Sequence, residues 1–376
     1  MKKILFRKLL SDYISFFLIA LLSSSIIIWV FQAVNYLDIM IEDGRDYIVY
    51  INYSLLNFPK IISRLFPFVL FFSLYYVTTK YENNNELIIF WNFGIHKIEL
   101  TNFVVKISLT LMIVQILLSS TIVPKTQDTA RNFLRTSSVN FFENFIKPQK
   151  FNDTIRGVTI YSESKDDDGN MNNLYLKKEN KDGFQITYAK KGIFKEFNKV
   201  PVLVLYSGET IKGGVSGITN FSFAKSDFPL NNFKTNTTTY VKTQELSSLK
   251  LYKCINSIYL SEQKEPDKNI ENCSLKNLKN IHKEIYKRFI VPFYIPLLTL
   301  ITFLLILSSK ENSDYYKLKI FTFMFGLFFI IFSETTVRLI SDNLVTNAFI
   351  AFMPYLSFAI LYLFLFKKLN FKSLST

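Results

Sequence analysis

Six long apolar stretches, separated by polar segments, dominate the pattern of this 376-residue chain. Each is about 20 residues long, the length with which an α-helix crosses the hydrocarbon core of a bilayer. They cover residues 14–34, 56–78, 103–123, 289–308, 320–340 and 348–366. The second stretch holds Lys60 and Arg64 in its first turns, where long side chains can reach the lipid headgroups. The pattern predicts a membrane protein with about six transmembrane helices.

The first stretch is expected to remain in the protein as a helix. It follows a basic start that contains Lys2, Lys3, Arg7 and Lys8. A secretory signal peptide has a shorter apolar core and ends at a small-residue cleavage site. The length of residues 14–34 therefore favours a membrane anchor over a cleaved leader.

Between the third and fourth stretches the chain becomes polar, with short runs of alternating apolar residues. This alternation predicts β-strands at 158–161, 174–177, 184–188, 193–197, 202–206 and 209–212. Turn signals separate the runs at 168–170, 182–183, 191–192 and 207–208. Many short strands of this kind favour a sandwich or barrel. Helices are expected at 246–260 and 275–288, the second leading into the fourth span.

The predicted fold is therefore an α-helical membrane protein with an inserted all-β domain. Three membrane helices fall within residues 1–123, the inserted domain within 124–287, and three more helices within 288–376. Lys and Arg next to short loops mark the cytoplasmic side of a membrane protein. Both ends of the chain are basic, whereas the loop at 35–53 is mainly acidic. Both termini are expected in the cytoplasm, and residues 124–287 on the other side.

The composition narrows the function. The net charge of +14 is typical of proteins that bind either nucleic acid or an anionic membrane surface. The six apolar stretches favour the membrane as the partner of this charge. Two cysteines and two histidines argue against a metal site built from these ligands. No Gly is followed by Lys, so the chain lacks a P-loop. With no recognisable catalytic Ser–His pattern either, we expect a protein without enzymatic activity or cofactor.

One candidate site is a short segment predicted to lie in the cytoplasm, at residues 85–93. Asn85 can begin a helix there and Gly94 can end it. The segment is rich in aromatic residues, which is typical of a surface that docks a partner. A helix lying flat in the lipid interface explains the same pattern.

Charged residues near the membrane supply further candidates. Glu334 and Arg338 are four positions apart in the fifth span, where they can pair with each other or face a polar path. A basic rim at the outer membrane face suits lipid phosphates or ordinary headgroup anchoring, and comprises Lys60, Arg64, Lys125, Arg131, Arg135, Lys287 and Arg288. Cys254 and Cys273 would lie in an oxidising compartment, as a disulfide or as two free thiols.

The order and spacing of several local patterns resemble the LptF/LptG family of lipopolysaccharide-export permeases. They are Phe58-Pro59 with Leu65-Phe66-Pro67, Asn85-Glu86-Leu87 with Gly94-Ile95, Ile122-Val123-Pro124, and Glu284 to Arg288 with Pro292. The resemblance covers essentially the whole chain. It implies three spans, a periplasmic β-jellyroll and three more spans in the bacterial inner membrane. Residues 221–223 and the stretch 246–260 resemble LptF more than LptG, whereas residues 130–133 look closer to LptG.

The resemblance also implies a function. The chain would be the permease subunit of an ABC transporter that extracts lipopolysaccharide and passes it to a periplasmic bridge. Its partners would be a second, homologous permease and a cytoplasmic ATPase dimer, coupled through Glu86, Leu87 and Gly94. Gln32 and Asn35 stand where some relatives carry lipid-binding basic residues near the outer end of the first span. A membrane-anchored periplasmic scaffold without transport activity is the alternative reading.

Overall fold

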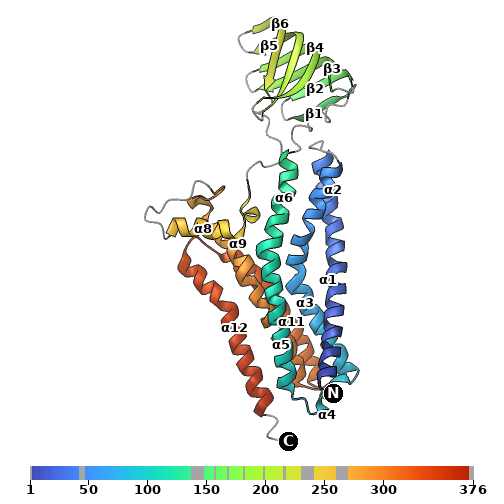
Figure 1. Ribbon diagram of the computed structural model, residues 1–376, viewed down its shortest axis with the longest axis vertical. Helices are drawn as coiled ribbons and strands as arrows, with labels where there is room; N and C mark the ends of the chain where they lie inside the picture. The colour runs from blue at the N-terminus through green and yellow to red at the C-terminus, as the bar shows by residue number, and fades with distance from the viewer. Residues whose placement is uncertain are drawn as a thin grey trace. The chain divides into compact units, whose positions relative to one another are not determined.

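The computed structural model describes residues 2–41, 47–136, 148–155, 158–166, 169–180, 183–197, 200–214, 217–229, 241–259 and 270–371 (Figure 1). Contacts between Cα atoms divide the chain into two compact units. The first comprises Met1–Val30, Asn57–Asp128 and Tyr240–Thr376, and the second comprises Phe31–Leu56 and Thr129–Thr239. The predicted helices at 246–260 and 275–288 thus belong with the membrane helices.

The prediction of six spans with an inserted β domain is confirmed. Six helical segments of the described chain are long and apolar enough to cross a membrane. The first three contain α1 (Lys2–Ile41), α2 (Tyr47–Leu56) with α3 (Phe58–Asn83), and α5 (Lys97–Leu117) with η1 (Leu118–Ile122) and α6 (Val123–Thr136). The last three contain α9 (Leu278–Ile285) to η6 (Leu304–Leu307), α11 (Tyr315–Leu339) and α12 (Leu344–Phe371). The chain is a multi-pass membrane protein.

The fourth span is the centre of the first unit. Its middle part, α10 (Tyr294–Phe303), is apolar on every side apart from Tyr294 and two threonines, and all ten of its residues are buried. A helix that is apolar all round is buried by its neighbours, and α10 packs against α3, α5, α11 and α12. Thr299 and Thr302 donate to backbone carbonyls one turn earlier in the same helix. Their hydroxyls thereby enter the apolar core without an unmet hydrogen bond.

The helices α3 and α11 meet at one very close contact. Gly326 of α11 faces the ring of Phe71, a fully buried residue of α3. A Cβ atom built on Gly326 would lie 2.0 Å from Cζ of Phe71. One turn further along, the hydroxyl of Tyr75 donates to the carbonyl of Lys319 at 3.0 Å. The absence of a side chain at Gly326 therefore sets the distance between the two helices.

Replacing Gly326 with Ala should lower the thermal unfolding midpoint of the purified protein. Overpacking of this kind costs about 1–3 kcal/mol. Phe71→Leu removes part of the ring, so the double variant should be destabilised by less than the sum of the two single variants. Strict additivity of the two losses would show that the Gly326–Phe71 contact does not fix the packing.

The second unit contains one antiparallel sheet of six described strands in the order β1-β2-β3-β4-β5-β6. The strands are β1 (Phe151–Ile155), β2 (Val158–Lys165), β3 (Met171–Asn180), β4 (Gly183–Phe197), β5 (Val200–Gly214) and β6 (Gly217–Pro229). Every strand pairs with its neighbour in sequence, which makes a meander. The Greek-key crossings of a jellyroll do not occur among these six strands. One face carries a buried cluster that includes Ile160, Leu174, Leu176 and Leu205.

Two of the predicted turns in this sheet were wrong. The glycines at 192 and 208 lie inside the long strands β4 and β5, which the sequence had divided in two. A Cβ on Gly192 would lie 2.4 Å from Leu174, and one on Gly208 would lie 2.1 Å from the carbonyl oxygen of Tyr188. These glycines therefore permit close approach within the sheet. Ser207 has φ of 50°. The ladder passes over it together with the residues opposite, Lys190 and Ala224, so the register of β5 with β4 and β6 does not change.

Candidate functional site

Four basic side chains gather where α3 begins. Lys60 and Arg64 lie one turn apart on α3, Lys287 lies in the π-helical turn η4 (Tyr286–Ile290), and Lys242 precedes the short helix η2 (Thr243–Glu245). We call these four residues the basic cluster. Lys60 is partly buried. It is close enough to the other three cations and to Glu284 to interact electrostatically with each of them. Arg64 and Lys287 are exposed.

Arg288, which the sequence placed with these residues in a headgroup-binding rim, is instead a buried anchor. Its side chain is 2 % exposed and its Nε donates to Oε1 of Glu284 at 3.2 Å. Nη1 donates to the carbonyl of Leu246 at 2.9 Å and to Oγ of Ser248 at 3.0 Å, and Nη2 donates to the carbonyl of Gln244 at 3.0 Å. A buried charge needs such partners because its removal from water is costly. Arg288 therefore fixes the chain at 244–248 and is not available to lipid.

Two π-helical turns provide the remaining hydrogen bonds of this anchor. The carbonyls of Ser120 in η1 and of Arg288 in η4 each accept a side-chain hydrogen bond from a neighbouring segment. Oγ of Ser119 donates to the carbonyl of Arg288 at 3.1 Å, and Oγ of Ser248 donates to the carbonyl of Ser120 at 2.7 Å. The third span, the fourth span and the start of α8 (Ser248–Tyr259) are thus joined at one point.

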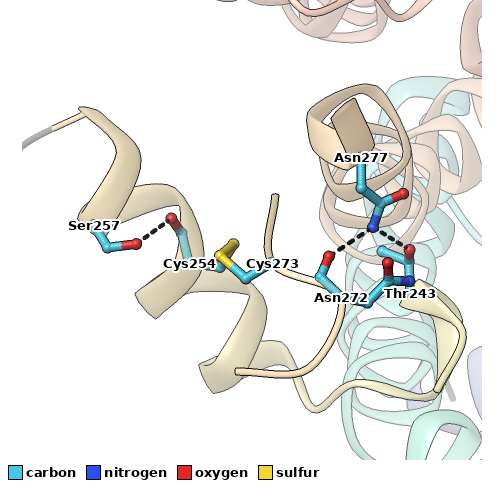
Figure 2. Close-up of a disulfide and its surroundings, with 6 residues drawn as sticks. All are labelled: Thr243, Cys254, Ser257, Asn272, Cys273 and Asn277. Carbon is cyan, nitrogen blue, oxygen red and sulfur yellow. Dashed lines mark hydrogen bonds between the residues drawn. A yellow bond between two sulfur atoms is a disulfide. The ribbon is translucent and has the colours of Figure 1, made fainter. Parts of the chain in front are cut away.

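A disulfide bond holds the helix α8, which follows residues 244–248, to the chain that leads into the fourth span. Figure 2 shows Cys254 of α8 bonded to Cys273, with their Cα atoms 5.9 Å apart. Nearby, the side-chain amide of Asn277 donates to Oγ1 of Thr243 and to the carbonyl of Asn272, both at 2.9 Å. Cys254 is fully buried in a small apolar cluster with Leu251 and Ile281. The segment that follows Lys242 is therefore held by Asn277 at Thr243 and by Arg288 at Gln244 and Leu246.

Replacing Arg288 with Ala should destabilise the protein by about 3–5 kcal/mol, because Glu284 and three other acceptors lose their buried donor. Lys287→Ala is the matched control, since this exposed neighbour should change stability by less than about 0.5 kcal/mol. Thermal unfolding in detergent measures both. Equal midpoints for the two variants would refute the anchoring role of Arg288.

The second candidate site is the short helix α4 (Glu86–Asn92), as predicted from the sequence. Asn85 lies at its start with φ of 61°, without a side-chain capping bond. At its end Gly94 has φ of 66°, and the amides of Gly94 and Ile95 donate to the carbonyls of Trp91 and Phe90. This pair of bonds is a Schellman motif, which requires the left-handed backbone that Gly adopts without strain. Gly94 thus determines where α4 ends.

The faces of α4 have different roles. Leu87 and Phe90 are 3 % exposed and pack into the core of the helix bundle. Ile88, Ile89 and Phe93 are between 42 % and 47 % exposed. Leu87 therefore attaches α4 to the bundle, and the exposed apolar side chains, with Glu86, form the surface that a partner or the lipid interface can reach. We call this surface the α4 face.

The region next to α4 is tied to the rest of the bundle by polar contacts. Tyr81 donates to Asp12 of α1, and Tyr13 and Thr78 share a hydrogen bond of 2.8 Å. On the other side, Oε1 of Glu82 accepts from the backbone amide of Lys310 at 2.8 Å. The ammonium group of Lys310 donates back to the carbonyl of Asn83 at 2.9 Å. These contacts attach the end of α3, directly before α4, to α1 and to the loop before α11.

The other predicted charged residues lie on α6 and α11. Glu334 and Arg338 are both exposed on α11, and no ion pair joins these two described residues. Arg131 is partly buried in α6, whereas the side chain of Arg135 lies outside the described part of the chain. Sequence reasoning missed Lys242, which only the fold brings to α3, and the hydrogen-bonding role of Arg288.

Comparison with known proteins identifies the family. The pattern of the lipopolysaccharide export system permease LptF/LptG matches residues 7–368. The chain belongs to the LptF/LptG family. It is also 24 % identical over 316 residues to the uncharacterized protein RP871 of Rickettsia prowazekii (strain Madrid E). The matched region covers 82 % of this chain and 84 % of that protein. Membership of the LptF/LptG family identifies the chain as a permease of lipopolysaccharide export and not as an enzyme.

Proposed function

We propose that this LptF/LptG-family permease extracts lipopolysaccharide from the inner membrane as one subunit of an ABC transporter. A second, homologous permease completes the membrane part, and a cytoplasmic ATPase dimer supplies the energy. The β domain passes the lipid to a periplasmic bridge by strand addition at a sheet edge. Both termini then lie in the cytoplasm and the β domain in the periplasm. Of the two family members, LptF is the one proposed.

The basic cluster is the observation that carries the lipid-binding part of this proposal. Lys60 and Arg64 are like charges one turn apart on α3, an arrangement that destabilises a helix unless an anion lies between them. The carboxylate of Glu284 is already bonded to Arg288, and that of Glu245 accepts from the backbone amide of Lys242. Much of their charge is therefore directed away from the side chains of the basic cluster. Guanidinium and ammonium groups bind phosphate oxygens with strong, charge-assisted hydrogen bonds. A phosphorylated glycolipid in the outer leaflet is a suitable ligand.

Reversing the charge at Lys60 and Arg64, both to Glu, should reduce photocrosslinking of lipopolysaccharide to the permease at least tenfold. A single lost hydrogen bond to a charged group already accounts for a change of that size. The matched control reverses Lys250 and Lys253, two exposed lysines three positions apart on α8. If both double variants assemble normally and crosslink lipopolysaccharide equally, the basic cluster is not part of the lipid path.

The α4 face supports the proposed coupling to an ATPase. Ile88, Ile89 and Phe93 are exposed at the same short helix as the acidic Glu86, whose carboxylate accepts a hydrogen bond from Asn84 at 3.1 Å. Leu87 holds α4 on the bundle because its side chain is buried there, and Gly94 ends the helix. The contacts from Tyr81 and Glu82 then connect an ATPase docked on α4 to α1 and α11. Glu334, Arg338, Arg131 and Arg135 remain proposed lipid contacts.

Glu86→Ala should weaken ATPase association, or separate ATP hydrolysis from lipopolysaccharide release, without changing the thermal stability of the permease. Glu86 makes few contacts in the folded chain, whereas a partner cation that it leaves unpaired at an interface costs more. Glu311→Ala, at an exposed acidic position before α11, should leave both properties unchanged. Normal ATPase binding and transport in the Glu86→Ala protein would remove the argument for coupling through α4.

A further inference from the structure

Lys97 lies between the short helix α4 and the end of the fourth span. It is the first residue of α5 and is partly buried. Its ammonium group donates to the carbonyl of Ile306 at 2.9 Å. The same group lies 5.6 Å from the centre of the Trp91 ring in α4, within the range of a cation–π contact. One side chain thus contacts α4 and the fourth span at the same time.

The bond to Ile306 is made where the fourth span ends. Ile306 belongs to the 3-10 turn η6, and the backbone is extended two residues later, at Ser308. The last carbonyls of a helix have no partner within it and form the negative end of its dipole. A lysine ammonium group is suited to this position by its positive charge and by its N–H donors. Lys97 therefore holds the end of the span whose middle part packs against α3, α5, α11 and α12.

The contact with Trp91 is made on the bundle side of α4. Trp91 is four positions after Leu87, so the two side chains lie on the same face of the helix. Trp91 is partly buried against the core cluster that contains Leu87 and Phe90. Lys97 thus holds α4 on the side that faces the helix bundle, and the α4 face stays accessible to a partner.

A second pair of bonds holds the chain before α4. The carboxylate of Glu82 accepts from the backbone amide of Lys310, and the ammonium group of Lys310 donates to the carbonyl of Asn83. Glu82 and Asn83 precede α4, whereas Lys97 follows it. The stretch 306–310 is therefore bonded to the chain on both sides of α4. Of these two attachments, Lys97 is the one that contacts a side chain of α4 itself.

We propose that Lys97 is the positioning residue that couples α4 to the fourth span. This inference rests on the proposed docking of an ATPase on α4. A force on the α4 face reaches the end of the fourth span through the Trp91 ring, the Lys97 ammonium group and the Ile306 carbonyl. The fourth span contacts α3, which carries Lys60 and Arg64 of the basic cluster. Without the charge of Lys97, α4 still docks the ATPase, but ATP hydrolysis is no longer tied to lipid release.

The test compares Lys97→Met, which keeps the length of the side chain but not its charge, with Lys97→Arg, which can donate to Ile306 and stack on Trp91. The complete transporter, with its second permease and ATPase, is reconstituted in proteoliposomes. Lys97→Met should bind the ATPase and hydrolyse ATP normally, but release about tenfold less lipopolysaccharide per ATP, the factor expected for a lost hydrogen bond to a charged group. Lys97→Arg should restore the ratio. The matched control, Lys317→Met, changes a side chain that is 84 % exposed and should leave the ratio unchanged.

Two further measurements keep the inference testable if Lys97→Met does not assemble. Trp91→Leu removes the aromatic face but keeps an apolar side chain, so it should also lower the release per ATP, and it should add little to Lys97→Met in the double variant. Hydrogen exchange of the purified chain needs no ATPase. The amides of residues 93–95, which are bonded at the end of α4, should exchange faster in Lys97→Met and in Trp91→Leu than in Lys317→Met.

The outcomes separate this inference from the proposed function. A wild-type release ratio in both Lys97→Met and Trp91→Leu, or an equal loss in Lys97→Met and Lys97→Arg, would overturn the positioning role. Unchanged exchange at residues 93–95 in both variants would overturn it too. If the wild-type permease binds no ATPase, the proposed function fails, and the exchange measurement alone decides whether Lys97 positions α4.

Discussion

Burial of the fourth span on every side is the constraint on which the helix bundle depends. In lipid, a backbone polar group that is not bonded within its own segment needs a partner from a neighbouring one. The fourth span contains Pro292 and Pro296 and changes between π-, 3-10- and α-helical turns. It can be this irregular because α3, α5, α11 and α12 surround it, and because Ser119 bonds the carbonyl of Arg288.

The groups that surround a basic side chain near the membrane determine whether it acts as a structural anchor or is available to an external anion. Arg288 is buried among four oxygen acceptors and acts as an anchor. Three of the four charged groups near Lys60 are cations, and within the described part of the chain no hydrogen bond or ion pair neutralises its ammonium group. Two basic residues of the same rim therefore differ in function, since one has its partners in the protein and the other is suited to an external anion.

The helix α3 connects the basic cluster to the region of α4. Its first turns carry the proposed site for the exported lipid, its middle meets α11 at Phe71, and its last turn carries Lys80 and leads to α4. The bonds of Tyr81 to Asp12 and of Glu82 to Lys310 attach its end to α1 and to the loop before α11. The helix α3 thus contacts α11, α1 and the segment that leads into α4.

Much of this fold was determined by the sequence alone, because membrane spans and hairpins are set by local periodicity. The six apolar stretches, the helix α4 with Gly94, and the β domain could all be predicted. Gly192 and Gly208 were misread as turns, since a glycine required for close approach looks the same in a sequence as one required for a turn. The burial of Arg288, the exposure of Glu334, and the approach of Lys242 to Lys60 were decided by the tertiary structure, because burial and pairing depend on segments distant in the chain.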